Sequence, residues 1–116
     1  MKTAIVTGAS GNLGQAVIKK FITEGYQVIG TVVPNDATPI NFSSERFDKA
    51  IVDLMNEDDS EKLIRSVVET HAEIDAAVLT VGGFAMGNIA NTSTTDIMKQ
   101  YKLNFETAYN IARPAF

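Results

Sequence analysis

The 116-residue sequence predicts an α/β protein built on one parallel, doubly wound sheet. Short apolar runs alternate along the chain with longer segments whose apolar residues recur at a helical period. The short runs do not alternate between polar and apolar residues, which is typical of strands covered on both faces. The length corresponds to about one small domain, so we treat residues 1–116 as a single unit.

The chain begins with a predicted strand, helix and second strand. Residues 2–7 form a β-rich run that Gly8 interrupts. A helix is expected over 12–24, where Gly25 provides a typical helix end. Residues 27–33 form the second β-rich run. The apolar stripe of this helix comprises Leu13, Val17 and Phe21.

A third strand and a second helix follow. Residues 34–48 are expected to form a loop with at most a short helix, and residues 49–53 form the third strand. Asn56 and Asp59 have the spacing of a helix start, which predicts a helix over 56–71. The residues that this helix is expected to bury are Leu63, Ile64, Val67 and Val68.

The last predicted elements are a fourth strand and a long helical region. Residues 75–80 are apolar on both faces and are ended by glycines. Ser93 and Asp96 are spaced as a helix cap, and the helix is expected to reach the terminus with a disturbance near Pro114.

Composition excludes several classes of function. The net charge of −4 argues against nucleic acid or an anionic membrane as the main partner, because both require a basic face. The absence of cysteine excludes disulfides, thiolate metal sites and thiol catalysis, and no other metal site is expected. No secretory signal or membrane-spanning run is visible, so we expect a soluble, cytoplasmic protein.

The segment Thr7–Gly14 carries a G-x-x-G-x-x-G turn between the first strand and the first helix. Glycines allow a pyrophosphate to approach the backbone closely, and the amides of a helix N-terminus attract the negative charge. We therefore predict a dinucleotide site here; a tight turn without a ligand is the alternative. A P-loop is excluded because no Gly-Lys-Ser/Thr follows.

The second predicted strand does not end in an acidic residue. The first carboxylate after it is Asp36, which we interpret as a solvated loop residue in preference to a ribose ligand. No Arg or Lys stands at the strand end to receive a 2′-phosphate. NAD and NADP therefore remain alternatives.

Four motifs together resemble the N-terminal half of a short-chain dehydrogenase/reductase. They are Thr7–Gly14, Val52-Asp53-Leu54, Ile74–Val78 and Leu103-Asn104-Phe105. The resemblance covers nearly the whole chain and implies a Rossmann-type sheet in the strand order 3-2-1-4. It also implies that Asn104 supports a proton relay behind the family's catalytic lysine. The cofactor-binding residues that it implies are Gly8, Ser10, Gly11, Asn12, Leu13, Gly14, Asp53, Leu54, Thr80, Val81 and Gly82.

The catalytic serine and Tyr-x-x-x-Lys pair of that family are not found in this sequence. Tyr109 and Arg113 have the nearest spacing, but we interpret them as helix surface or core. The resemblance thus implies an NAD(P)-dependent oxidoreductase acting on an alcohol or carbonyl, with this chain as its dinucleotide-binding half and inactive alone. A non-catalytic dinucleotide-sensing module is one alternative, and the glycine spacing keeps a nucleotide-sugar epimerase of the extended branch as another.

Two expectations concern assembly. The fourth strand would be a bare apolar edge, and the last helix carries more apolar residues than one face can bury. We expect either a homo-oligomer formed through these surfaces or a chain shortened from a longer parent. The second is favoured, because Arg113–Phe116 stops within an element.

Overall fold

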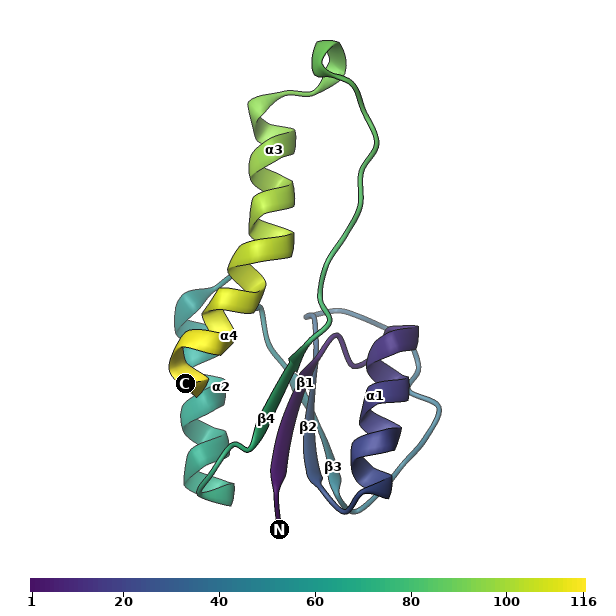
Figure 1. Ribbon diagram of the computed structural model, residues 1–116, viewed down its shortest axis with the longest axis vertical. Coiled ribbons are helices and arrows are strands. Elements are labelled where there is room, and N and C mark those ends of the chain that lie inside the picture. The colour runs from purple at the N-terminus through teal and green to yellow at the C-terminus, as the bar shows by residue number, and fades with distance from the viewer.

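The computed structural model describes residues 1–116 and shows one four-stranded parallel sheet in the order β3-β2-β1-β4 (Figure 1). Ile5 of the central strand β1 pairs with Ile29 of β2 on one side and with Ala77 of β4 on the other. The predicted parallel sheet and its strand order are therefore confirmed. The strands are β1 (Thr3–Thr7), β2 (Gln27–Val32), β3 (Phe47–Ile51) and β4 (Ala76–Leu79). The helices are α1 (Asn12–Thr23), α2 (Glu57–His71), α3 (Thr94–Tyr101) and α4 (Thr107–Ala115).

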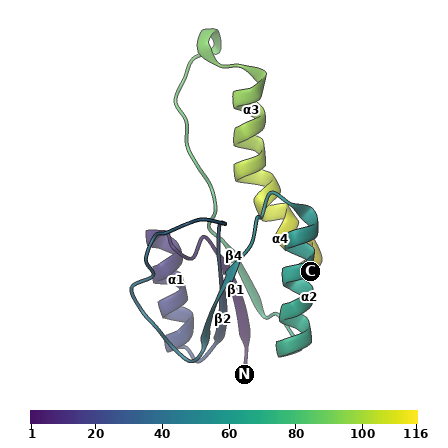
Figure 2. The same ribbon diagram turned by 180° about the vertical axis from the view of Figure 1, so that it is seen from behind.

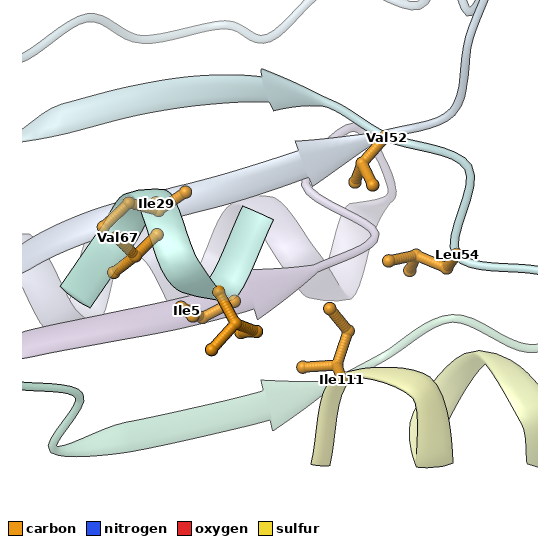
Figure 3. Packing of buried hydrophobic residues seen from close by; sticks show 7 residues of the cluster. Ile5, Ile29, Val52, Leu54, Val67 and Ile111 are labelled. Atoms are coloured by element: carbon orange, nitrogen blue, oxygen red, sulfur yellow. The ribbon is translucent and has the colours of Figure 1, made fainter. Parts of the chain in front are cut away.

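Helices cover both faces of the sheet. Figures 1 and 2 show α1 on one face and α2 with α4 on the other. Neighbouring residues of β1 serve the two layers: Val6 packs with Ile18 of α1, whereas Ile5 belongs to the cluster that includes Val67 and Ile111 (Figure 3). A strand that is buried on both faces needs apolar residues at successive positions, which explains the lack of polar alternation.

The third strand begins and ends two residues earlier than predicted. Val28 of β2 pairs with Phe47, and the strand ends at Ile51. The apolar signal that suggested a later strand comes from Val52 and Leu54, which follow β3 and are buried in the core beside Ile111 (Figure 3). Burial of the connection, and not strand pairing, accounts for these two apolar positions.

The segment between β2 and β3 contains no helix, in keeping with the expectation of a loop with at most a short helix. Two positions that were expected to be buried need correction. Val68 of α2 is 43% exposed, so that helix buries Ile64 and Val67 without it. Leu13 of α1 is 65% exposed, because it lies in the first turn, beyond the part of the helix that covers the sheet.

The last helical region is long and stands out from the sheet. The chain leaves β4, reaches a short 3₁₀ turn at Ile89–Asn91, and returns through α3 and α4 (Figure 1). A single π-helical turn, Lys102–Glu106, joins these two helices. Pro114 stands in the final turn of α4, which ends at Ala115. No helix in the structure has both the length and the apolar character needed to cross a membrane.

Candidate functional site

A cavity of about 340 Å³ opens at the carboxyl ends of β1, β2 and β4. Parallel strands place their following loops at one edge of the sheet, and ligands of such sheets bind where the chain switches sides. Here the switch lies at β1, which has β2 on one side and β4 on the other. The predicted cofactor-binding residues that line the cavity are Gly8, Ser10, Gly11, Asn12, Leu13, Gly14, Leu54, Thr80, Val81 and Gly82.

Asp53 is the predicted cofactor-binding residue that the structure does not place in the lining. It is exposed, and its carboxylate accepts a hydrogen bond from the Met55 amide at 3.0 Å. The lining instead includes residues at and after the end of β2 that the sequence analysis did not assign to the site, among them Thr31, Val33 and Asp36. Their place next to the glycine turn follows from the β1–β2 pairing, which was itself predictable.

The N-terminus of α1 borders this cavity. Gly11 caps the helix without any side-chain hydrogen bond, and its own amide donates to the Gly8 carbonyl at 3.1 Å. The amides of Asn12 and Leu13 have no protein acceptor, as is usual in an uncapped first turn. These donors, together with the positive end of the helix dipole, suit an anionic group.

Gly11 and Gly14 of the turn differ in how closely the protein surrounds them. A Cβ on Gly14 would lie 1.9 Å from the Gly8 carbonyl oxygen, so close packing within the protein demands glycine there. A Cβ on Gly11 would meet only that same oxygen, at an ordinary 3.5 Å, and the backbone of Gly11 is in the extended region with φ −74°. The protein itself therefore gives Gly11 no steric reason to be glycine.

Hydrogen bonds fix the cavity wall that follows β4. The Thr80 amide donates to Thr7 Oγ1 at 3.1 Å, and the Thr80 hydroxyl donates to the Thr7 carbonyl. Further along, the Gly83 amide donates to Asn104 Oδ1 at 2.9 Å. The segment from 80 to 83 is thereby tied to β1 at one end and to the π-helical turn at the other.

Asp36 is fastened to the glycine turn. The Ser10 hydroxyl donates to one carboxylate oxygen of Asp36 at 2.6 Å, and the Thr38 amide donates to the other at 2.8 Å. Hydrogen bonds from Ser10 and then Thr38 stabilise the ionised form and lower the pKa of Asp36 from 3.8 to about 2. Asp36 is a loop residue, as expected from the sequence, and Ser10 and Thr38 hold its carboxylate in place.

The residues considered for acid–base chemistry lie outside the cavity. The side-chain oxygen of Asn104 accepts a hydrogen bond from the Gly83 amide. Its side-chain nitrogen donates to the Gln100 carbonyl and to the Gln100 side chain. Tyr109 is 51% exposed and stacks on Phe105. Arg113 pairs with Glu57 at 3.5 Å, so Tyr109 and Arg113 do not form a reacting pair. The interpretation of these two residues as helix surface agrees with their positions.

Comparisons with known proteins agree with this architecture. A model of the short chain dehydrogenase family matches residues 2–116. Acetoacetyl-CoA reductase from Acinetobacter sp. (strain RA3849) is 26% identical over 99% of this chain and 49% of its own length. The chain spans about half the length of the curated relatives it matches.

Solved structures show the same fold. A dehydrogenase/reductase from Sinorhizobium meliloti superposes with a TM-score of 0.87 at 27% identity, covering 98% of this chain and 48% of that protein. A variant of ElxO with NADPH bound also has a TM-score of 0.87, at 24% identity and with the same coverage. Together with the family match over residues 2–116 and the Rossmann-type sheet, these findings lead to one conclusion: the chain belongs to the short-chain dehydrogenase family.

Proposed function

We propose that this chain is the dinucleotide-binding half of an NAD(P)-dependent oxidoreductase that transfers hydride between a nicotinamide and an alcohol or carbonyl substrate. The observation that carries the proposal is the combination at Gly11 and the first turn of α1. Unpaired amides border a cavity at the switch point of the sheet, and the residue beside them, Gly11, has room where a side chain would stand.

The lining residues suit the parts of a dinucleotide. The amides of Asn12 and Leu13 would bind the diphosphate at the helix N-terminus. Apolar Val33 and Leu54 would pack against the adenine. The nicotinamide supplies hydride transfer when bound, and the segment 80–82, which Thr7 holds in place, would support that end of the cofactor.

In this proposal the chain binds and orients the cofactor. The family's serine and Tyr-x-x-x-Lys do not occur in the sequence, and Asn104 accepts a hydrogen bond from the amide of Gly83, which follows the lining residue Gly82. We therefore assign Asn104 a positioning role, in which it holds the loop that follows β4 against the helix.

The proposal is tested by titrating the purified protein with NADH and NADPH while following nicotinamide fluorescence. We expect saturable binding of at least one of them, and about tenfold weaker binding after Gly11→Ala, since the added methyl group would obstruct the diphosphate. The free energy of unfolding of Gly11→Ala should change little, because the new Cβ meets only an ordinary contact.

Gly25→Ala is the matched control, at the other end of α1. Gly25 has φ +88° with open space around it, so alanine costs about 1 kcal/mol of stability and leaves cofactor affinity unchanged. Failure of both dinucleotides to bind at millimolar concentration would overturn the proposed function. If the native protein and Gly11→Ala bind the dinucleotides with equal affinity, the glycine turn does not contribute to cofactor binding.

A further inference from the structure

Part of the loop between β2 and β3, residues 37–43, is hydrogen-bonded to the rest of the molecule through Gln15 of α1. These residues make no hydrogen bond between backbone groups. Every hydrogen bond that joins them to another element ends on Gln15. The side-chain nitrogen of Gln15 donates to the Pro39 carbonyl at 3.3 Å, and its side-chain oxygen accepts from the Asn41 amide at 3.2 Å. Gln15 is therefore the hydrogen-bonding link between α1 and this part of the loop.

Apolar packing holds the same stretch of the loop against α1. Ile40 and Phe42 are partly buried against the cluster that contains Ile18. The Lys19 ammonium lies 5.4 Å from the centroid of the Phe42 ring. Gln15 stands one turn earlier on the same face of the helix, at the end that borders the cavity. Apolar packing is not directional, so the bonds of Gln15 fix how the loop meets that end of the helix.

The third hydrogen bond of Gln15 reaches back into the glycine turn. Its side-chain nitrogen also donates to the Ser10 carbonyl at 2.9 Å. Gly11 supplies the N–H of the same peptide unit, and that amide donates to the Gly8 carbonyl at 3.1 Å. A peptide unit is planar, so these two bonds fix its orientation. The unpaired amides of the first helical turn follow directly, and the donors proposed for the diphosphate therefore need little ordering on binding.

We propose that Gln15 is a positioning residue of the cofactor site, which holds the Ser10–Gly11 peptide and residues 37–43 together so that cofactor binding and attachment of the loop strengthen each other. The inference rests on the proposed function. Glutamine suits this task because one uncharged side chain supplies both N–H donors and an acceptor. Glutamate would lose the donors to the two carbonyls, and lysine would lose the acceptor for the Asn41 amide. Such coupling is reciprocal, so a ligand that orders the turn also protects the loop.

The first measurement compares the dissociation constants of NADH, NADPH and ADP for the native protein and for Gln15→Met. Methionine has a similar length and helix propensity but makes none of the three hydrogen bonds. We expect Gln15→Met to bind ADP and the dinucleotides about five- to tenfold more weakly. Gln27→Met is the matched control, because Gln27 contacts Asp48 and lies outside the lining; it should bind them as the native protein does.

The second measurement is amide exchange by NMR, which distinguishes the coupling from a general loss of stability. In the native protein, saturating ADP should slow the exchange of the Asn41 amide. In Gln15→Met this amide should exchange about fivefold faster and should not respond to ADP. Gln15→Glu retains the acceptor, so it should keep the Asn41 amide protected without restoring the affinity for ADP.

The outcomes separate this inference from the proposed function. Native-like affinity for ADP in Gln15→Met or Gln15→Glu would overturn the role of Gln15 and leave the proposed function intact. The same follows if the native protein binds ADP without any change in the exchange of the Asn41 amide. Failure of the native protein to bind either dinucleotide would overturn the proposed function itself, and this inference with it.

Discussion

Single side chains that bind backbone groups of distant segments fix the loops around the cavity. Thr7 holds the Thr80 amide, and Asn110 of α4 donates to the Leu54 carbonyl at 2.8 Å. Each of these bonds joins residues more than 50 positions apart in the chain. The cavity is therefore shaped by residues that do not all line it, and substitutions outside the lining can change its geometry.

We expect Asp36 to make the free energy of unfolding depend on pH in the acid range. The pKa of Asp36 is lowered in the folded protein. Its contribution to the free energy of unfolding is therefore fully present above the unfolded-state pKa of 3.8 and disappears as the pH falls to about 2. We expect the stability difference between the native protein and Asp36→Asn to be constant near neutral pH and to shrink across that acid range. Urea unfolding at a series of pH values measures it, and a difference that grows toward low pH would contradict the assignment.

The site was predictable where it depends on local sequence. Three glycines between a strand and a helix identify the glycine turn in the sequence, and residues of this turn line one cavity. The contact between Ser10 and Asp36 was not predictable, because it joins residues 26 apart through a turn that only the fold brings back. Asp53 was assigned by family resemblance alone, and the path of the chain after β3 directs it to Met55.

Whole elements were predicted where apolar periodicity reflects packing. The helices α1 and α2 and the strands β1 and β2 lie within a residue or two of their expected bounds. The predicted bounds of β3 were two residues too late because Val52 and Leu54 are buried in the connection that follows the strand. Apolar sequence alone does not distinguish such burial from strand pairing. The π-helical turn Lys102–Glu106 has no signal in the pattern, since it inserts into an otherwise continuous helix.

The π-helical turn positions Asn104, whose role can be tested by a pair of substitutions. Asn104→Ala removes the acceptor for the Gly83 amide, and we expect this amide to exchange with solvent about five- to tenfold faster, for a bond contributing about 1 kcal/mol. Asn104→Asp keeps an acceptor oxygen and should retain much of the protection. Amide exchange measured by NMR checks both variants, and equal protection in Asn104→Ala and the native protein would show that the bond does not hold the loop.

At the scale of the whole molecule, helices cover both faces of the sheet, but the edge strand β4 and the last helical region leave apolar surface exposed. The strand β4 pairs only with β1 and exposes Ala77, in a molecule that extends over 52 × 28 × 23 Å. Tyr101, Phe105 and Tyr109 stack along the last helical region at centroid distances of 5.4 and 6.0 Å, each roughly half exposed. The sequence indicated this excess of apolar residues without showing which of them would be exposed.

Of the two possibilities that the sequence leaves open, self-association is the one that this row of rings allows to be tested. Aromatic rings that remain half exposed gain free energy when a second surface covers them, on the order of 2 kcal/mol for each ring. Phe105 stands in the middle of the row, and Phe105→Ser should weaken association by about tenfold or more. Phe84→Ser is the control, because Phe84 is 86% exposed in the loop after β4 and has no stacked neighbour. Sedimentation velocity over a concentration series measures the effect; a native protein that stays monomeric at high micromolar concentration, or equal weakening by both variants, would show that the row does not mediate association.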